Sequence, residues 1–132
     1  MTAAYWAIII AFVMILVPRG FGIAGQWRLP GGFDYGASRD QQAQLTGMAR
    51  RAQAAHLNGI EGFAPFAIAV WMAQEVGANS ASVNQWAMAY AASRILFVIA
   101  YMADLNPWRT VIWLAGMVCN IALFVLAARA GL

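Results

Sequence analysis

The chain has 132 residues, of which 63% are hydrophobic and 10% are charged. Soluble domains carry about a quarter charged residues, so this composition indicates an integral membrane protein and excludes an ordinary soluble domain. The net charge is +3, and all basic residues are arginines that stand mostly singly along the chain, which is a poor pattern for nucleic-acid binding. We therefore expect one membrane domain over residues 1–132 that binds no nucleic acid.

Hydrophobic segments predict an all-α, four-transmembrane-helix bundle. In chain order, the expected spans are residues 3–24, 42–76, 81–104 and 108–129, which match the roughly twenty residues or more that cross a bilayer. Residues 25–41 are rich in glycine and carry mixed charges, which predicts the one long loop. Pro65 lies inside the second span and should kink it. A turn at 77–80 and the pair Asn106 and Pro107 separate the later spans.

The arginines also predict the orientation in the membrane. From Arg19 to Arg51 the chain holds five arginines and two aspartates, whereas the N-terminal segment has no basic side chain. Connections rich in arginine stay on the cytoplasmic side of a membrane. We therefore expect residues 25–41 to form a cytoplasmic loop and both termini to lie on the outer side, with Arg129 opposing this orientation only weakly.

The second span contains polar residues that a lipid-facing helix excludes. Residues 51–66 read RAQAAHLNGIEGFAPF. At about 100° per residue, with Arg51 set to zero, Asn58 falls near 340° and Glu61 near 280°, so these three share one stripe. His56 falls at about 140°, on the opposite side of the helix. Ionisable residues inside a membrane are costly, which makes the stripe a candidate functional site.

The third and fourth spans carry polar faces of their own. On the third span, Arg94 and Tyr101 stand seven residues apart and share a face. On the fourth span, Arg109 begins a series at helical spacing that continues with Trp113, Gly116 and Asn120. Arg94 is expected near mid-membrane, and the cytoplasmic half is expected to hold Arg51, Asn58, Glu61, Tyr101 and Arg109.

Arginines that converge with a carboxylate, an amide and a phenol favour a polar, charged small molecule as ligand. Glu61 can take an ammonium group, the arginines can take carboxylates or a thiolate, and Tyr101 can donate one hydrogen bond. Two structural alternatives stay open. Arg94 and Glu61 can pair with each other, and Asn58 can join two helices by hydrogen bonding.

No metal site is expected. His56 is the single histidine, and no cysteine or second carboxylate stands at ligand spacing. Cys119 lies in an apolar run and is interpreted as a small apolar filler. His56 lies opposite the polar stripe, so it cannot reach the same ligand within its own bundle. It can reach a ligand if the second span also lines a neighbouring subunit's pocket. This predicts a ring-like homo-oligomer with sites between subunits.

At these positions the sequence resembles the MAPEG family, the membrane-associated proteins in eicosanoid and glutathione metabolism. The resemblance covers nearly the whole chain, and FDYGASRDQQAQLTGMARRAQAAHLNGIEGFAPF is similar to the bacterial branch. The other matching features are the second-span motif Asn58, Glu61 and Pro65, the pair Arg94 and Tyr101, and PWRT at residues 107–110. The resemblance implies a homotrimer with glutathione bound between subunits near the cytoplasmic side. In a bacterial inner membrane, the orientation that the arginines predict makes both termini periplasmic.

The resemblance also implies roles for individual residues in binding glutathione as a cosubstrate. Asn58 and Glu61 match positions that hold the glutathione backbone, and Tyr101 matches a tyrosine at the same site. His56 matches a position that reaches glutathione in the neighbouring subunit. The expected binding set is completed by Arg51, Arg94 and Thr110, the last of which matches a hydroxyl position.

The expected chemistry centres on Arg109, which matches the arginine credited with stabilising the glutathione thiolate. A free thiol has a pKa of about 8.5, so a guanidinium at contact distance is needed to hold a thiolate at neutral pH. This predicts a glutathione-dependent membrane transferase or peroxidase. Its second substrate is expected to be an apolar electrophile or a lipid hydroperoxide that arrives through the bilayer.

Two departures from the family pattern keep other functions open. Ala54 stands where well-studied members often carry arginine, and Phe97 stands where they often carry tyrosine or histidine; Arg51, one turn earlier, can replace the missing charge. The first alternative is a non-catalytic lipid-binding or accessory membrane protein of the same fold. The second is a small proton-coupled transporter that uses Glu61, which the surrounding arginines disfavour because nearby cations hinder proton cycling at a carboxylate.

Overall fold

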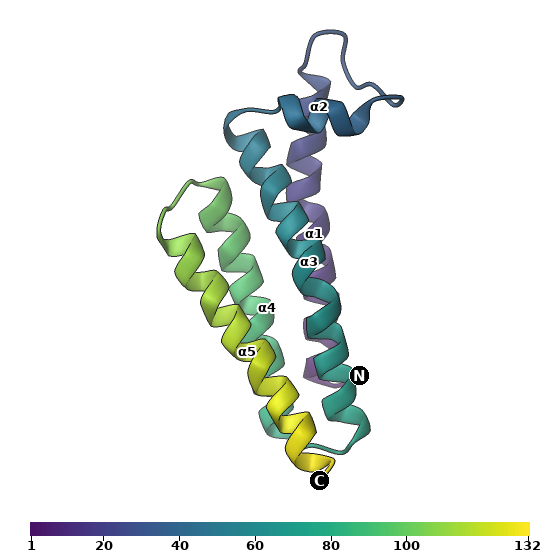
Figure 1. The fold of residues 1–132 in the computed structure, drawn as a ribbon, viewed down its shortest axis with the longest axis vertical. Helices are drawn as coiled ribbons and strands as arrows, with labels where there is room; N and C mark the ends of the chain where they lie inside the picture. Colours follow the sequence, from purple (N-terminus) through teal and green to yellow (C-terminus); the bar gives the residue numbers. More distant parts are fainter.

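The computed structural model describes residues 1–132 as a bundle of long helices with one short helix across its end (Figure 1). The expected all-α architecture is confirmed. In chain order, the helices are α1 (Ala3–Trp27), α2 (Ser38–Gln44), α3 (Gly47–Glu75), α4 (Ser80–Met102) and α5 (Trp108–Ala130).

The main difference from the expected helix bounds lies between α1 and α3. We expected a loop over 25–41 and a second helix from Gln42, but α1 continues to Trp27 and the short helix α2 occupies Ser38–Gln44. Leu45 and Thr46 then adopt extended backbone, with ψ angles of 144° and 166°, so α3 begins only at Gly47. The hydrophobic pattern could not reveal α2 because this helix is almost entirely polar.

The long helices are arranged so that α1 packs against α3 and α4, and α5 packs against the same two helices. No contact joins α1 to α5. The bundle therefore has one face where α3 meets α5 and an opposite face where α1 meets α4. Both termini lie at one end of the bundle, and α2 crosses the other end (Figure 1).

Small side chains allow the helices to approach closely. The buried core is rich in alanine, with Phe66 and Leu123 among its largest fully buried side chains. A Cβ atom added to Gly25 of α1 would lie 2.5 Å from the Cβ atom of Ala49 on α3, which no real structure accommodates. Such close backbone approach replaces the hydrophobic effect as the source of helix association inside a membrane.

The helix α2 is held by side-chain hydrogen bonds rather than by apolar packing. Gln26 of α1 is fully buried, accepts a hydrogen bond from Nη1 of Arg19 at 2.8 Å and donates one from Nε2 to Oγ of Ser38 at 3.1 Å. Gln41 of α2 donates to the carbonyl of Gly32 at 2.8 Å. These bonds fix the loop and α2 over the end of the bundle.

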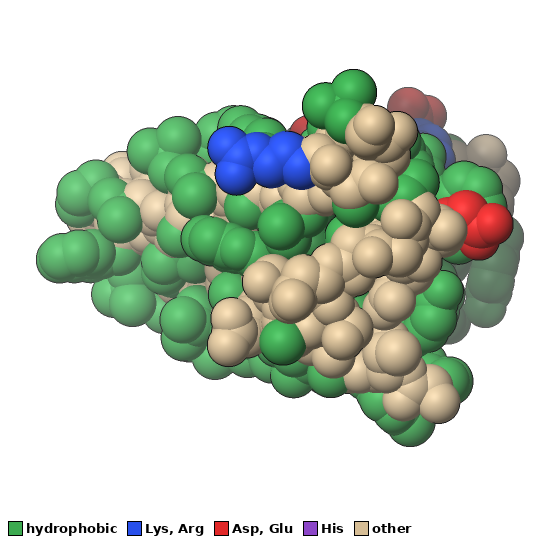
Figure 2. All heavy atoms as spheres, turned by 90° about the horizontal axis from the view of Figure 1, so that it is seen from below, with side chains coloured by type: hydrophobic (Ala, Val, Ile, Leu, Met, Phe, Trp, Pro, Cys, Tyr) green, Lys and Arg blue, Asp and Glu red, His purple; other side chains and the backbone are tan.

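The outer surface of the bundle suits a bilayer. Two helices, α1 and α5, are long and apolar enough to cross a membrane by length and composition alone. Their outward side chains include Phe12, Leu16, Val118 and Val125, all of which are exposed. Seen from the end that carries the termini, hydrophobic side chains cover the left and lower margins of the bundle, whereas polar side chains and backbone occupy much of the centre and right (Figure 2). The helices α3 and α4 carry most of the polar residues that distinguish this bundle from a simple apolar one.

Candidate functional site

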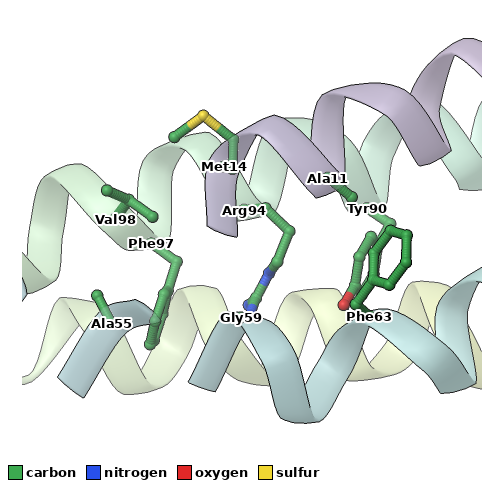
Figure 3. A pocket seen from close by; sticks show the side chains of 9 residues that line it. All are labelled: Ala11, Met14, Ala55, Gly59, Phe63, Tyr90, Arg94, Phe97 and Val98. Atoms are coloured by element: carbon green, nitrogen blue, oxygen red, sulfur yellow. The ribbon is translucent and has the colours of Figure 1, made fainter. Parts of the chain in front are cut away.

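A buried arginine stands at the centre of the molecule. Arg94 of α4 is 6% exposed and extends toward Gly59 of α3, with Phe97 on one side and Tyr90 on the other (Figure 3). Its guanidinium carbon lies 4.6 Å from the ring centre of Phe97 and 5.4 Å from that of Tyr90. Nη1 donates a hydrogen bond to Oδ1 of Asn58 at 3.1 Å. Stacking and one neutral partner therefore hold this cation, with no carboxylate paired to it.

An inner cavity of about 270 Å³ opens beside Arg94, where α3, α4 and α5 meet. Its lining combines a carboxylate, a guanidinium and two amides with aromatic and small side chains. The lining residues are Asn58, Glu61, Gly62, Pro65, Tyr90, Arg94, Trp113, Gly116, Met117 and Asn120. The cavity is thus chemically matched to a polar ligand although it lies among membrane helices.

Two buried polar atoms of this lining have no partner in the chain. They are Nε of Arg94, a donor, and Oδ1 of Asn120, an acceptor. Both side chains are more than nine-tenths buried, at 6% and 7% exposed. Buried polar atoms are almost always hydrogen-bonded, and leaving one unpaired costs roughly 1–3 kcal/mol. Two residues that line the inner cavity therefore each hold one unpaired polar atom, and both atoms are buried.

An outer cavity of about 250 Å³ adjoins the inner one toward the α2 end of the bundle. It is lined by Asn58, Phe97, Tyr101, Arg109, Thr110 and Trp113. Asn58 and Trp113 line both cavities, so the two spaces meet at these side chains. A single elongated molecule can therefore touch the polar groups of both cavities.

Arg109 occupies the second position of α5, at the edge of the outer cavity. Its guanidinium carbon stacks 4.5 Å from the ring centre of Tyr101. Nη1 lies 3.7 Å from Oδ1 of Asp104, whose side chain is 61% exposed. A long ion pair with an exposed carboxylate is weak, so the guanidinium of Arg109 remains available to bind an anionic group of a ligand. The N-terminus of α5 adds a positive partial charge at the same place.

The structure brings together six of the eight predicted site residues along these cavities, namely Asn58, Glu61, Arg94, Tyr101, Arg109 and Thr110. It places the other two elsewhere. Nε of Arg51 donates to the carbonyl of Met102 at 3.0 Å, which ties Arg51 to the end of α4 and away from both cavities. Nδ1 of His56 lies 2.8 Å from the carbonyl of Ile15 on α1. Because a carbonyl only accepts, Nδ1 carries the proton, and His56 faces away from the cavities as its helical angle predicts.

The structural alternative for Arg94 and Glu61 is not realised. The single salt bridge of the chain joins Arg109 to Asp104, and Arg94 is bonded to Asn58 instead. Glu61 is exposed at the inner cavity without a cationic partner. No group of three histidine, cysteine, aspartate or glutamate side chains is arranged to hold a metal ion.

The sequence pattern placed Gly116 and Asn120 on one face of the fourth span without assigning them to the site, and the structure adds Tyr90 to the same cavity. The hydroxyl of Tyr90 donates to the carbonyl of Gly62 at 3.1 Å and its ring stacks on Phe66 at 3.9 Å. A Cβ atom at Gly116 would lie 2.8 Å from Oγ of Ser93 and 3.2 Å from Nη2 of Arg94. Glycine at this position therefore leaves room for the guanidinium. The helical spacing of Trp113, Gly116 and Asn120 after Arg109 was the available signal.

The fold and the cavities define an α-helical membrane protein with polar cavities among its helices. The sequence model of the MAPEG family matches residues 3–129, and the chain belongs to this family of integral membrane proteins with four transmembrane helices. The family includes glutathione-dependent transferases and peroxidases, and its members typically bind glutathione. Comparison with the curated proteins and with the solved structures gave no match.

Proposed function

We propose that this chain is a glutathione-dependent membrane transferase or peroxidase that acts on apolar electrophiles or lipid hydroperoxides. The observation that carries the proposal is the junction of the two cavities at Asn58. The inner cavity contains the unpaired carboxylate of Glu61, the buried guanidinium of Arg94 and the amide of Asn120, whose oxygen is unpaired. The outer cavity contains the guanidinium of Arg109 at the N-terminus of α5. Glutathione carries an ammonium group, two carboxylates and a thiol, and these groups complement that set.

In this proposal the inner cavity holds the charged part of the tripeptide. Glu61, which has no cation of its own, accepts hydrogen bonds from an ammonium group. Nε of Arg94 and Oδ1 of Asn120 gain the partners that they lack within the chain. A molecule that satisfies both buried atoms recovers the free energy lost by leaving them unpaired, which favours a polar ligand over an acyl chain in this space.

The outer cavity performs the chemistry. Arg109 and the positive end of α5 stabilise the thiolate relative to the thiol, which lowers the pKa of the bound cysteine. Tyr101 stacks on Arg109 and limits the orientations of its guanidinium. In the transfer reaction, the thiolate attacks the electrophilic carbon and the leaving group departs with its electron pair. In the peroxidase reaction, two glutathione molecules are oxidised to the disulfide while the hydroperoxide is reduced to an alcohol and water.

We further propose a homotrimer in a bacterial inner membrane, with the α2 end in the cytoplasm. The arginines between α1 and α3 support this orientation, because it places them on the side where basic connections stay. His56 supports a site shared between subunits, because Nδ1 binds the carbonyl of Ile15 and Nε2 remains free to contact a ligand in the neighbouring subunit. Cysteine substitution at Gly36 and at Leu132 tests the orientation. Labelling of position 36 only from the periplasmic side would overturn it.

One observation favours a second function, a non-catalytic lipid-binding or accessory membrane protein of the same fold. Phe97 lines the outer cavity and lies against Arg94, so it presents an apolar ring where a polar side chain would assist a reaction. A protein of this kind binds glutathione or a lipid without converting it. Turnover, rather than binding, separates the two functions.

The test of the proposal is a titration of the full chain in lipid nanodiscs with glutathione, followed by turnover assays. The control ligand is γ-glutamyl-alanyl-glycine, which lacks only the sulfur and should bind with similar affinity. Turnover is measured with 1-chloro-2,4-dinitrobenzene and with a lipid hydroperoxide. Saturable binding with turnover supports the proposal. Binding without turnover favours the accessory function. The absence of saturable binding contradicts glutathione binding of either kind, with or without turnover.

A further inference from the structure

The turn between α4 and α5 holds a carboxylate beside Arg109. Asp104 has a backbone φ of 57°, and it is the only residue other than glycine with a positive φ. Its N–H donates to the carbonyl of Tyr101 at 3.2 Å, and the N–H of Leu105 donates to the carbonyl of Ala100 at 2.8 Å. Asp104 therefore ends α4 in the left-handed conformation that glycine adopts most easily, and an aspartate at this place is less favourable for the fold.

The side chain of Asp104 acts on Arg109 rather than on the helix ends. Its Oδ1 atom lies 3.7 Å from Nη1 of Arg109, and this contact is the single salt bridge of the chain. No side chain caps the start of α5, whose N-cap residue is Pro107, so the carboxylate does not serve as a helix cap. A residue held in an unfavourable backbone conformation, with its side chain directed to one cation, indicates a role for that pair.

Asp104 and the sulfur of a bound glutathione are alternative anions for Arg109. The guanidinium of Arg109 lines the outer cavity, whereas Asp104 lines neither cavity and its side chain is 61% exposed. A negative charge beside a guanidinium weakens the attraction of that cation for a second anion. Asp104 therefore opposes ionisation of the thiol. It becomes the main anionic partner of Arg109 whenever the sulfur is neutral, which is the case before ionisation and after transfer.

We infer that Asp104 is a positioning residue that limits how strongly Arg109 stabilises the thiolate and so keeps the sulfur nucleophilic. The inference rests on the proposed function. A thiolate that is stabilised more strongly is more abundant at neutral pH, but it attacks more slowly, because nucleophilicity falls with the pKa of the thiol with a Brønsted coefficient of about 0.4–0.5. Asp104 thus lowers the amount of thiolate and raises the reactivity of each thiolate.

The other charged or titratable groups around the sulfur lie on the two helices that pack against α5, and on the proposed neighbouring subunit. They are Arg51 and Glu61 of α3, Arg94 and Tyr101 of α4, and His56 across the proposed interface. All of them are unchanged in a variant of Asp104. A difference in pH profile between the wild-type chain and such a variant therefore reports the carboxylate of Asp104.

The first experiment measures the ultraviolet absorbance of the bound thiolate, and turnover of 1-chloro-2,4-dinitrobenzene at saturating glutathione, against pH in phosphatidylcholine nanodiscs. Asp104→Asn removes the charge and keeps a residue type that tolerates a positive φ. It should raise the acid dissociation constant of the bound thiol about two- to fivefold, the range of an exposed ion pair. Turnover should rise at pH values below the pKa of the thiol and fall by about 1.4- to 2-fold on the plateau above it. Loss of a merely structural contact would not change turnover in opposite directions at low and high pH.

Two further variants separate the charge of Asp104 from its backbone conformation. Asp104→Gly removes the same carboxylate and favours the positive φ, so it should give the same pH profile with an equal or higher unfolding temperature. Asp40→Asn removes an equal charge from α2, at the same end of the bundle and outside both cavities, and should leave the profile of the wild-type chain unchanged. A shifted profile in Asp104→Asn that is absent in Asp104→Gly would overturn the inference.

Two ligands that do not react test the same competition without turnover. Glutathione sulfonate carries a permanent negative charge on its sulfur group, whereas the sulfur of S-methylglutathione is neutral. Asp104→Asn should tighten binding of the sulfonate about two- to fivefold relative to S-methylglutathione. Binding of both ligands with an unchanged ratio of affinities would overturn the inference and leave glutathione binding in place. Binding of neither ligand would contradict the proposed function and overturn the inference with it.

Discussion

Asn58 of α3 accepts a 3.1 Å hydrogen bond from Arg94 of α4 at the point where the inner and outer cavities meet. The bond uses the side-chain oxygen of Asn58 and leaves its amide nitrogen free to donate to a ligand. It also fixes the guanidinium of Arg94, whose Nε is buried and unpaired. One hydrogen bond between two helices thus sets the position of donors in both cavities.

Asn120→Leu should weaken glutathione binding without destabilising the fold. Oδ1 of Asn120 is buried and unpaired, so an apolar side chain of similar size removes a desolvation cost and should leave the unfolding temperature unchanged or higher. The lost ligand hydrogen bond, of about 1 kcal/mol, should raise Kd roughly fivefold. Calorimetry and thermal unfolding check the two results, and Met117→Leu is the control in the same cavity. A lower unfolding temperature with unchanged Kd would show that Asn120 serves the fold instead.

Gly116→Ala should displace the guanidinium of Arg94. The added Cβ atom would lie 2.8 Å from Oγ of Ser93 and 3.2 Å from Nη2 of Arg94, and both distances are too short. We expect glutathione Kd to rise on the order of tenfold, the effect of losing about 1.4 kcal/mol of binding energy. Gly20→Ala is the control, because nothing lies within 4 Å of its Cβ position.

The double change Gly116→Ala with Ser93→Ala removes the closer of these two contacts. It should recover part of the lost affinity if the effect is steric. Equal affinity in the wild-type chain and in Gly116→Ala would contradict the position given to Arg94.

Glu61→Gln should affect binding far more than turnover. Glu61 is proposed to hold an ammonium group equally in the bound substrate and in the transition state, and such uniform binding sets affinity rather than kcat. A hydrogen bond between charged groups contributes about 1.5–3 kcal/mol, so Kd should rise tenfold or more. The rate at saturating glutathione should stay within about twofold. A large loss of kcat with unchanged KM would move Glu61 to a chemical role.

His56 should act in a neighbouring subunit's site if the chain is a trimer. His56 faces α1 and away from the cavities of its own chain, so its effect on glutathione must pass between subunits. His56→Ala and Arg109→Ala, each of low activity alone, should regain part of the wild-type activity when mixed trimers are assembled. Mixed trimers then contain sites with both residues intact. Absence of any recovery in verified mixed trimers would contradict a shared site.

The order of the helices and most of the cavity lining could be predicted because both depend on periodicity. Spacing of three, four and seven residues placed Arg94 and Tyr101 on one face of α4 and placed Trp113, Gly116 and Asn120 on one face of α5, and most of these side chains line the cavities. Helical angle also placed His56 opposite the polar stripe. A membrane helix has few other positions for polar residues, so the pattern is strong.

The position of each side chain along its helix axis could not be predicted with the same accuracy as its helical angle. Arg51 shares a helical angle with Asn58, but it lies seven residues, or about 10 Å, closer to the helix start. At that height it meets the last turn of α4, where the carbonyl of Met102 accepts its hydrogen bond. The short helix α2 was missed for another reason, since its position depends on side-chain bonds of Gln26 and Gln41 that have no periodic signature.

Arg109→Ala tests the proposed chemistry most directly, through the ultraviolet absorbance of the bound thiolate measured against pH together with turnover. Arg109 interacts most strongly once the sulfur is ionised, whereas the inner cavity holds the rest of the tripeptide. Removal of the guanidinium should therefore raise the pKa of the bound thiol and slow turnover by about tenfold per pKa unit near neutral pH, with Kd changed little. Arg109→Lys, which keeps the charge, should have a thiol pKa and a turnover rate between those of the wild-type chain and Arg109→Ala. An unchanged thiolate pKa and unchanged turnover in Arg109→Ala would contradict the assignment and favour the non-catalytic function.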